Sequence, residues 1–406
     1  MKRILRIINR FNLGGPVYNA AYLTKYLYPE YETLLIGGIQ EDDEESAEFI
    51  LNSLGIKAVV IPEMHRSING INDFIAYKKI KKIIKDFKPH IVHTHASKAG
   101  MLGRKAAYDL NVPVIVHTFH GHVFHSYFNS IKTKAFIEIE RKLAKITDKI
   151  IAISPSQKKE LIELYKIANA DKFEVIPLGL DLQRFKENKE EKRYIFRKQH
   201  NIESNEIIVV TVGRLAPIKN HKLFIKAVAK AKEVTHCKIR AFIVGDGDIK
   251  KDLEKIAQDL NLKISSNEAN NYNSDIHFLG WVKDVDYVYS GADIVALTSL
   301  NEGTPVSLIE AQANGKPIVS TNVGGIEDIV LPGVSALLSP SNSEDIFIEN
   351  FIRLIKDKQL RTEMSNKAEK YVFDKFNINR LVNDMKSLYD KLLQQKNVFT
   401  GFAKVV

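Results

Sequence analysis

Short apolar runs alternate with longer amphipathic stretches along almost the whole chain. The short runs have the length of buried strands, and the stretches between them have the apolar spacing of helices. A chain that repeats strand and helix in this order winds a parallel sheet with helices on both faces. The expected strands are 4–8, 33–36, 58–61, 91–94, 114–118, 149–153 and 173–176 in the first half, and 207–213, 240–245, 276–279, 294–298, 317–320 and 335–338 in the second.

A chain of 406 residues can bury two such sheets. The segment 179–206 is charged, nearly free of apolar runs, and follows the turn-prone Pro177. We therefore expect an α/β protein with two Rossmann-like domains, at 1–178 and 207–378, joined by a linker at 179–206. The segment 379–406 begins with a helical pattern, and we expect it to pack back on the first domain.

Cysteine content and hydropathy exclude several classes of protein. Cys237 is the only cysteine, which excludes an internal disulfide framework and suits a reducing cytoplasm. The longest uncharged stretch, 110–131, contains four histidines, a proline and a glycine, so it does not read as a membrane span. We expect a cytoplasmic protein.

The formal net charge of +10 is concentrated in the first half of the chain. Its densest part is the segment 74–88, in which lysines alternate with isoleucines and phenylalanines. This pattern fits the solvated face of an amphipathic helix, or a surface that attracts anionic lipid or a phosphate-bearing acceptor. No aromatic-interleaved basic patch accompanies the charge, so we do not expect a nucleic acid partner. The lysines are Lys78, Lys79, Lys81, Lys82, Lys85 and Lys88.

The segment 301–311, NEGTPVSLIEA, follows an expected strand and leads into a helix. Thr304 is a good N-cap and Pro305 a good first helical residue, which would leave backbone amides free to bind a phosphate. Glu302 precedes this helix and Glu310 lies nearly two turns inside it, so each carboxylate can accept hydrogen bonds from separate hydroxyls. The alternative is a capping loop with an exposed helical glutamate.

Two cations and a glycine pair follow other strands of the expected sheets. Arg214 and Lys219 come directly after the strand 207–213, where a guanidinium fork and a mobile ammonium suit a diphosphate. Either alone would read as a surface charge. Gly14 and Gly15 follow the first strand and would let the backbone approach a ligand.

A further glycine-containing motif, at 245–248, resembles a dinucleotide fingerprint only superficially. The sequence there is Gly-Asp-Gly-Asp, which lacks the three-glycine spacing of that fingerprint. We assign it no binding role.

Six histidines lie near the ends of two expected strands. His93 and His95 share one face of a strand, but neither an acidic ligand cluster nor a zinc-helix pattern accompanies them, so a metal is not favoured. His120, before Gly121 and just past a strand end, is the better candidate for contact with a sugar. The others are expected to serve packing or the acceptor side: His93, His95, His117, His122 and His125.

Taken together, these motifs resemble the retaining family 4 glycosyltransferases, which have the GT-B fold. The motifs are Gly14-Gly15, His120-Gly121, IPLGLDLQRF at 176–185, GRLAPIKN at 213–220, and Glu302 with Glu310. The likeness covers nearly the whole chain, with the motifs in the expected order. It implies two facing Rossmann-like domains with parallel sheets and an interdomain cleft.

The resemblance also implies roles for residues. Arg214 and Lys219 would hold the diphosphate of a nucleotide sugar, Glu310 its ribose and Glu302 the sugar hydroxyls, while His120 would contact the donor sugar. The base would pack near the strand before Val282. No metal or other cofactor is required, and the sugar would be transferred from one face. The expected donor-binding residues are Gly14, Gly15, Arg214, Lys219, Val282, Glu302, Gly303, Thr304, Pro305, Val306 and Glu310, and the expected catalytic ones are Arg214, Lys219, Glu302 and His120.

The histidine-rich stretch is similar to transferases that build bacterial capsule, exopolysaccharide or O-antigen units on a lipid-diphosphate carrier. It suggests a UDP-linked hexose or N-acetylhexosamine as donor, a lipid-linked or oligosaccharide acceptor, and peripheral association with the anionic inner face of the membrane. Pro305 stands where many relatives carry another residue, which leaves the sugar open. Two alternatives are a nucleotide-sugar isomerase or hydrolase, and an inactive assembly partner.

Overall fold

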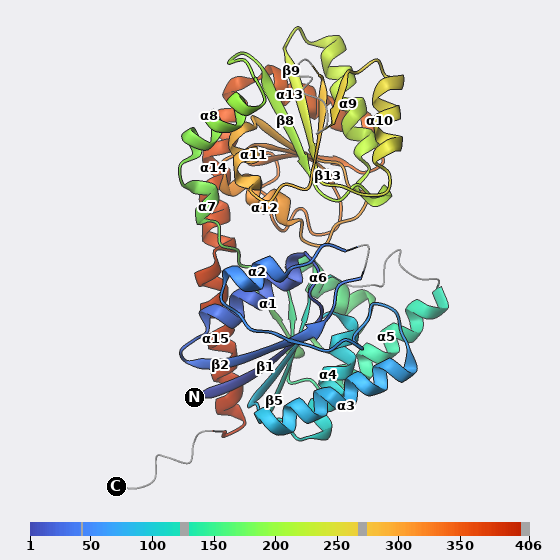
Figure 1. Cartoon of the computed structure of the whole chain (residues 1–406), viewed down its shortest axis with the longest axis vertical. Helices are drawn as coiled ribbons and strands as arrows, with labels where there is room; N and C mark the ends of the chain where they lie inside the picture. The colour runs from blue at the N-terminus through green and yellow to red at the C-terminus, as the bar shows by residue number, and fades with distance from the viewer. Residues whose placement is uncertain (42–43, 122–129, 267–273, 399–406) are drawn as a thin grey trace. The chain divides into compact units, whose positions relative to one another are not determined.

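The structure is a computed structural model that describes residues 1–41, 44–121, 130–266 and 274–398. The chain forms two compact units (Figure 1). The first consists of Met1–Leu180 and Phe376–Val406, and the second of Asp181–Lys375. Each unit is built on its own parallel sheet.

The first unit contains a sheet of seven strands in the order β3-β2-β1-β4-β5-β6-β7, and every neighbouring pair is parallel. The strands are β1 (Lys2–Arg10), β2 (Tyr31–Gly38), β3 (Val59–Val60), β4 (Ile91–His95), β5 (Val114–Phe119), β6 (Lys149–Ala152) and β7 (Phe173–Val175). Its helices are α1 (Gly15–Tyr26), α2 (Glu48–Ser53), α3 (Gly70–Phe87), α4 (Ser97–Asp109), α5 (Ser130–Lys145), α6 (Pro155–Lys159) and α15 (Ile378–Gln395).

The second unit repeats this plan with the order β10-β11-β9-β8-β12-β13-β14, again parallel throughout. The strands are β8 (Ile207–Val212), β9 (Ile239–Val244), β10 (Ile264–Ser266), β11 (Ile276–Gly280), β12 (Ile294–Leu297), β13 (Ile318–Asn322) and β14 (Ala336–Pro340). Its helices are α7 (Gln183–Lys186), α8 (Lys189–Gln199), α9 (His221–Val234), α10 (Lys250–Asp259), α11 (Val285–Gly291), α12 (Val306–Ala313), α13 (Glu344–Lys356) and α14 (Lys358–Phe376).

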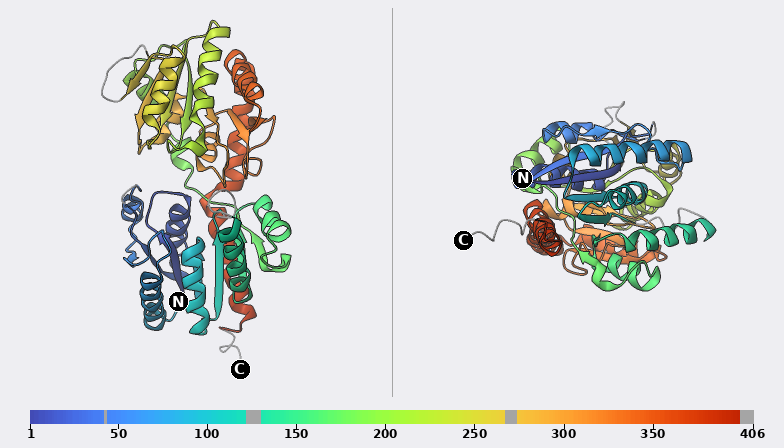
Figure 2. Two further views of the ribbon diagram at one scale, coloured as in Figure 1. Left: turned by 90° about the vertical axis from the view of Figure 1, so that its right-hand side faces the viewer. Right: turned by 90° about the horizontal axis from the view of Figure 1, so that it is seen from below.

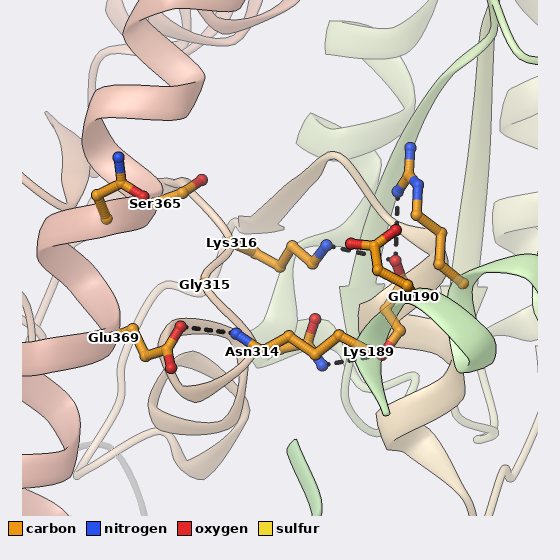
Figure 3. Close-up of a pocket in the computed structure, with 10 residues that line it drawn as sticks. Lys189, Glu190, Asn314, Gly315, Lys316, Ser365 and Glu369 are labelled. Carbon is orange, nitrogen blue, oxygen red and sulfur yellow. Dashed lines mark hydrogen bonds and ion pairs between the residues drawn. The ribbon is translucent and has the colours of Figure 1, made fainter. Parts of the chain in front are cut away.

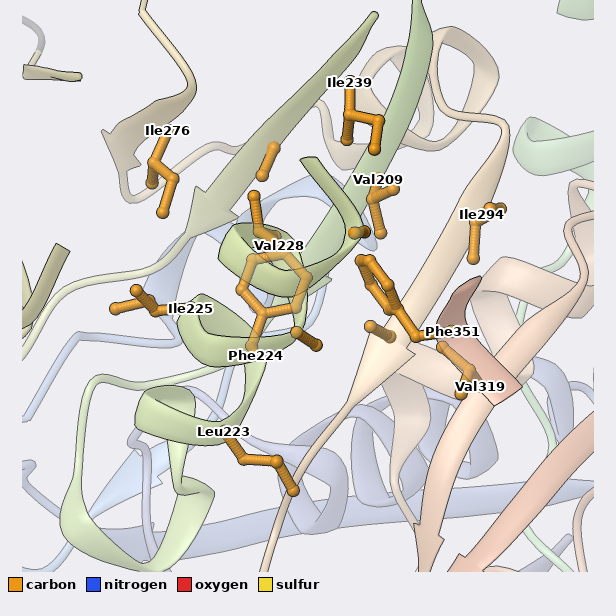
Figure 4. Close-up of a cluster of buried hydrophobic side chains, with 14 of the residues drawn as sticks. Val209, Leu223, Phe224, Ile225, Val228, Ile239, Ile276, Ile294, Val319 and Phe351 are labelled. Carbon is orange, nitrogen blue, oxygen red and sulfur yellow. The ribbon is translucent and has the colours of Figure 1, made fainter. Parts of the chain in front are cut away.

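The core of the second unit lies between its sheet and the helices α9 and α13. Phe224 of α9 and Phe351 of α13 are fully buried and pack with Val209 and Ile294 of the central strands (Figure 4). Burial of such side chains contributes about 2–3 kcal/mol each. This core fixes β8 and β12, the two strands whose following loops carry the charged motifs.

Helix α15 covers one face of the first sheet, although it follows the second unit in the chain (Figure 2). Met385, Leu388 and Tyr389 on this helix belong to the same buried cluster as Ile4 of β1 and Ile91 of β4. The helix therefore completes the first core, and it brings a tyrosine from near the end of the described chain against the central strands.

The segment 179–206 is not a linker, which corrects the expected domain boundaries. The chain passes into the second unit at Asp181 and leaves it after Lys375, and 181–206 already forms α7 and α8. Phe196 of α8 is buried in a separate apolar cluster of the second unit, and Arg193 is paired with Asp293 at 2.7 Å. A single aromatic anchor on a highly charged helix explains why the sequence pattern looked unstructured.

All the strands expected from the apolar runs are present, and both sheets are parallel as predicted. One described strand was missed. The edge strand β10 is only three residues long and ends in two serines, so it lacks an apolar run. Among the described helices, none is long and apolar enough to cross a membrane.

Candidate active site

The order of the second sheet changes direction at β8. The chain adds β9 and β11 on one side of β8, and then β12 and β13 on the other. Where an open parallel sheet reverses in this way, the loops after the two central strands diverge and form a crevice that binds ligands. The loop after β8 carries Arg214 and Lys219, and the loop after β12 carries Glu302. The two charged motifs therefore meet at one edge of one sheet.

Two glycines allow the neighbouring loop after β9 to approach the Arg214 loop closely. Gly245 has a φ of 133°, and a Cβ there would lie 2.1 Å from the carbonyl oxygen of Gly213. A Cβ on Gly247 would lie 2.3 Å from the carbonyl oxygen of Leu215, whose own amide donates to the Asp246 carbonyl at 2.8 Å. This motif supports the backbone of the loop, a role that the sequence did not reveal.

Arg214 itself is exposed, and within the described part of the chain its side chain has no hydrogen bond or ion pair. Lys219 differs, because its Nζ donates to Oε1 of Glu302 at 2.6 Å. The fully buried Ser299 donates to the same oxygen through its Oγ at 2.5 Å. The sequence placed Lys219 and Glu302 at one ligand, and the structure brings their side chains into direct contact.

Further hydrogen bonds join the two loops into one frame. The amide of Leu300 donates to the Ile218 carbonyl at 2.8 Å, and Oγ1 of Thr298 donates to the Lys219 carbonyl at 3.0 Å. Oε2 of Glu302 has no hydrogen bond from any described residue. The frame thus presents one carboxylate oxygen that is free to accept ligand hydroxyls, and the loop that carries Lys219 also carries the unpaired guanidinium of Arg214.

The helix after the Glu302 loop starts later than predicted. Helix α12 begins at Val306, and Pro305 is its N-cap with φ −70° and ψ 106°. Thr304 therefore caps nothing, and no side chain caps this helix. Because Pro305 is extended, it cannot be the first helical residue. The amides of Val306 and Ser307 have no carbonyl four residues back within the helix, so they suit an anion.

Glu310 lies in the second turn of α12, beside buried Tyr289. The Tyr289 hydroxyl lies 3.3 Å from Oε2 of Glu310 and 3.1 Å from the Ser307 carbonyl oxygen. Burial raises the pKa of Glu310 to about 7, opposed by the positive charge of Arg184. The carboxyl group consequently changes its charge near neutral pH, unlike an ordinary exposed glutamate.

Val282 is partly buried and, like Val212 and Leu279, packs against the buried cluster that includes Phe196 and Phe242. This position, just after β11, lies at the same end of the sheet as the Arg214 loop. It forms an apolar surface there that would suit a flat base.

A second glycine pair, Gly324-Gly325, was not singled out from the sequence. It follows β13 and lies against the backbone of the Glu302 loop, with the Gly325 amide donating to the Gly303 carbonyl at 3.1 Å. Gly324 has a φ of 54°, and a Cβ on Gly325 would lie 2.2 Å from that carbonyl oxygen. The sequence signal that could have identified this pair was two consecutive glycines soon after an expected strand.

The first sheet also reverses direction, between β1 and β4. Gly14 is the N-cap of α1 and Gly15 its first residue, so the expected glycine turn follows β1. A Cβ on Gly14 would meet only Cδ of Pro16, at 3.7 Å. The position is open enough for close approach of a ligand to the backbone.

The histidines lie on two faces of this sheet rather than in one cluster. His93 and His95 are buried on the face covered by α15, together with Arg6 of β1. His117 lies on the other face, where its Nδ1 is 2.8 Å from Oγ1 of Thr94. His122 and His125 lie outside the described residues.

His120 is linked to this buried group, since its Nε2 lies 2.8 Å from Nδ1 of His95. Burial, together with the charge of Arg6, lowers the pKa of His120 to about 3. The imidazole is therefore neutral at physiological pH. The described residues contain no group of three or more histidine, cysteine, aspartate or glutamate side chains placed to hold a metal ion.

Two family models together match most of the chain. The model of glycosyltransferase family 4 matches residues 14–184, and that of the group 1 glycosyl transferases matches residues 192–371. An Escherichia coli protein, UDP-Gal:alpha-D-GlcNAc-diphosphoundecaprenol alpha-1,3-galactosyltransferase, is 33% identical over 346 residues, which cover 84% of this chain and 85% of that protein. The chain belongs to the family 4 (group 1) glycosyltransferases.

Other relatives of the transferase support this assignment. The Staphylococcus aureus capsular polysaccharide biosynthesis glycosyltransferase CapM is 25% identical, over 83% of this chain and 86% of its own. Anabaena HepE, solved in complex with UDP, has a TM-score of 0.79 at 20% identity, covering 96% of this chain and all of that one. The expected family, GT-B fold and enzyme class are confirmed.

The second unit of the transferase also has a polar cavity at the opposite ends of its strands, where α12 leads into β13 (Figure 3). Burial lowers the pKa of Lys316 in this cavity to about 7. The neighbouring Lys189 is paired with Glu369 at 2.6 Å, and Arg193 with Asp293. These pairs join α8, α14 and the strand β12 region, so the cavity serves as a structural junction.

Proposed function

We propose that the transferase moves a hexose or N-acetylhexosamine from a UDP-sugar to a lipid-linked glycan acceptor, with retention of configuration, in the synthesis of a bacterial surface polysaccharide. The donor is supported by the E. coli relative, which is a UDP-Gal galactosyltransferase, and by HepE, solved with UDP and with UDP-glucose. The acceptor is supported by the same relative, which acts on a diphosphoundecaprenol-linked GlcNAc.

The observation that carries this proposal is the frame formed by Lys219, Ser299 and Glu302 beside exposed Arg214 at the switch point of the second sheet. A diphosphate needs two cations of different kinds. Arg214 supplies a fork with fixed geometry, and Lys219 supplies a point charge whose position is set by its ion pair with Glu302. The amides at the start of α12 add further donors.

Each remaining residue then has a chemical task. Glu302 and the backbone of Gly303–Pro305 would accept and donate hydrogen bonds to the sugar hydroxyls, with the start of α12 at Val306 close behind. Glu310 would accept from the ribose hydroxyls, and Val282 would pack on the base. In the first unit, His120 would donate to the transferred sugar, and Gly14 and Gly15 would allow close approach of their backbone.

Catalysis would rest on stabilising the departing diphosphate. Negative charge would develop on the leaving oxygen as the sugar becomes oxocarbenium-like, and Arg214, Lys219 and the helix amides would stabilise that charge. Glu302 is engaged by both Lys219 and Ser299, which suits gripping a hydroxyl better than nucleophilic attack. We therefore favour attack by the acceptor on the face that the diphosphate leaves, without a metal.

Peripheral membrane association would use the start of α3. Ile71 and Phe74 are 75% and 56% exposed, and Ile68 and Ile75 are exposed nearby. Lys78 lies one turn further along, with its Nζ 4.5 Å from the centre of the Phe74 ring. Exposed apolar side chains beside a row of lysines suit the interface of an anionic bilayer, where a lipid-linked acceptor would reside.

The decisive experiment is a transfer assay with the full chain. A panel of UDP-hexoses and UDP-N-acetylhexosamines is offered together with a diphospholipid-linked GlcNAc, and the product anomer is determined by NMR. We expect one donor to be transferred with its anomeric configuration retained. Inverted product would overturn the front-face route.

Two further outcomes would favour the other functions. Turnover of the donor at the same rate without acceptor would indicate a hydrolase or isomerase. Absence of calorimetric binding for every nucleotide sugar would indicate an inactive assembly partner.

A further inference from the structure

Arg6 is a buried cation without a carboxylate partner in the described structure. Its side chain is completely inaccessible to solvent, and its hydrogen-bond partners are two imidazoles and a phenol. Nη1 lies 2.8 Å from Nδ1 of His93 and 3.2 Å from Nε2 of His95, and Nη2 lies 3.3 Å from the Tyr389 hydroxyl. Burying a charge carries a desolvation penalty, and no ion pair with a described residue offsets it here. Arg6 can instead set the state of the groups around it.

The guanidinium determines where the protons lie on the rings around it. Arginine can only donate, so the nitrogens that it faces, Nδ1 of His93 and Nε2 of His95, must be acceptors. His95 is neutral, because burial, together with the neighbouring imidazoles and the charge of Arg6, holds its pKa well below the usual range. Its single proton therefore lies on Nδ1, which is the atom that faces His120.

The proton position on His95 in turn determines the proton position on His120. Nδ1–H of His95 donates across 2.8 Å to Nε2 of His120, so that nitrogen is an acceptor. Since His120 is neutral as well, its proton lies on Nδ1. This is the tautomer that free histidine disfavours. The hydrogen bond on one ring nitrogen thus sets the state of the other.

Nδ1 of His120 is buried and has no hydrogen-bond partner among the described residues. A buried donor without a partner is unfavourable, so this N–H group is stabilised when a ligand oxygen accepts its hydrogen bond. The chain of bonds from Arg6 also polarises this N–H, because successive hydrogen bonds strengthen one another.

We propose that Arg6, acting through His95, fixes His120 as the Nδ1–H tautomer, so that His120 serves as a neutral hydrogen-bond donor to an oxygen of the sugar substrate. Arg6 and His95 are positioning residues, and His120 alone touches the substrate. This inference rests on the proposed function for the role of His120, but the tautomer itself is independent of any activity.

Tyr389 of helix α15 makes hydrogen bonds to both Arg6 and His93. Its hydroxyl lies 2.6 Å from Nδ1 of His93, and Nε2 of His93 lies 2.7 Å from Oγ1 of Thr118. Because Nδ1 of His93 is an acceptor, the phenol donates to it and accepts from Arg6. The Tyr389 hydroxyl therefore helps to fix the position of the Arg6 guanidinium against the sheet.

The test is ¹⁵N NMR of the full chain with labelled histidine. Long-range ¹H–¹⁵N correlations report the tautomer of each ring, and the His120→Asn variant identifies the His120 signals. We expect His120 and His95 in the Nδ1–H form and His93 in the Nε2–H form. An Nε2–H signal for His120 in the wild-type chain would overturn the proposal.

Two substitutions of His95 separate the hydrogen bond from packing. The asparagine amide in His95→Asn still donates from the position of Nδ1, whereas His95→Leu removes the donor. We expect His95→Leu to release His120 to mixed tautomers and to lower kcat about tenfold with unchanged UDP affinity. His95→Asn should restore most of the lost kcat and the Nδ1–H signal. Equal kcat and the same tautomer in the two variants would contradict the relay.

The failure of this inference is distinguishable from failure of the proposed function. If no nucleotide sugar is turned over by the wild-type chain, the function is wrong whatever the tautomer of His120. If transfer occurs but His120 carries its proton on Nε2, only the relay is wrong. The His236→Gln variant, at an exposed histidine of the second unit, is the control and should change neither readout.

Discussion

The two units of the transferase share one architecture but place the charged groups that we assign to function differently. Both are seven-stranded parallel sheets that reverse direction next to their first strand. In the second unit the charged groups lie on loops beyond the strands, with Arg214 exposed and Lys219 paired to Glu302. In the first unit the cation, Arg6, lies inside the sheet layer among neutral imidazoles.

This difference shows how one fold can provide two kinds of chemistry. Loop cations can meet a diphosphate directly, and their partners can be exchanged for the ligand at small cost. A buried cation cannot meet a ligand, but it can set the protonation of groups that do. We therefore expect substitutions in the second unit to act on donor binding and charge stabilisation, and those in the first unit to act on kcat.

The largest effect is expected for Arg214→Ala. Loss of the fork on the diphosphate should lower kcat/KM for transfer about 10²- to 10³-fold, the range seen when one preorganised donor to a developing charge is removed. Because Arg214 is exposed, the melting temperature should not change. The Lys222→Ala variant, at an exposed lysine of α9, is the matched control and should retain wild-type kcat/KM.

The second-largest effect is expected for a substitution that changes no charge. In Gly325→Ala the new Cβ would lie 2.2 Å from the Gly303 carbonyl oxygen, so the Glu302 loop must shift. We expect UDP-sugar affinity, measured by calorimetry, to fall about 10- to 100-fold, with a stability loss of about 1–3 kcal/mol. Gly333→Ala gives the contrast, because a Cβ there meets nothing, although its positive φ adds a small strain. Wild-type donor affinity in Gly325→Ala would show that the loop need not be held.

The pH dependence of donor binding tests the role of Glu310. If the ionised carboxylate accepts the ribose hydroxyls, affinity for a UDP-sugar should rise about tenfold from pH 6 to pH 8, since the pKa of Glu310 is about 7 in the free protein. A UDP-sugar is the right probe because its diphosphate does not titrate in this range. In Glu310→Gln the profile should be flat, and an unchanged slope would remove Glu310 from the site.

The same group has a stability consequence of opposite sign. Its pKa is raised on folding, so its contribution to stability is present below the unfolded pKa and is lost as pH rises through about 7. Glu310→Gln should therefore gain stability relative to the wild type as pH rises from 5 to 8, by thermal denaturation without ligand.

The smallest effect is expected at the surface of the first unit. Lys78→Glu or Lys85→Glu should weaken sedimentation with anionic vesicles about fivefold each, equivalent to about 1 kcal/mol per basic residue. Lys222→Glu, in the second unit, should leave it unchanged. Vesicle binding that does not weaken as salt rises would contradict an electrostatic contribution from the α3 lysines.

Much of the fold could be predicted because a buried parallel strand leaves a local mark in the sequence. The runs IIVVTV and IVAL became β8 and β12 where the pattern placed them. Helix α8 could not be predicted, because one buried phenylalanine on an otherwise charged segment gives no periodicity. The start of α12 was misplaced by one residue, because Thr304 and Pro305 are common both at and just before helix starts.

The residues of the candidate site could be predicted from their types and positions in the sequence. Their contacts with one another could not. Lys219 and Glu302 are 83 positions apart, and only the order of the strands brings them together. Tyr389 is still more distant from His93, and its helix could have packed on either face. The even spacing of His93 and His95 predicted that they share a face, yet nothing local to β4 indicated that Arg6 would contact both.

The most direct test of the central claim is calorimetric titration of UDP into the wild-type chain, Arg214→Ala, Lys222→Ala and His95→Leu. We expect Arg214→Ala to lose at least about tenfold in affinity, while the other two variants bind UDP within about twofold of wild type. Wild-type affinity in Arg214→Ala, or an equal loss in His95→Leu, would contradict a diphosphate site on the second unit.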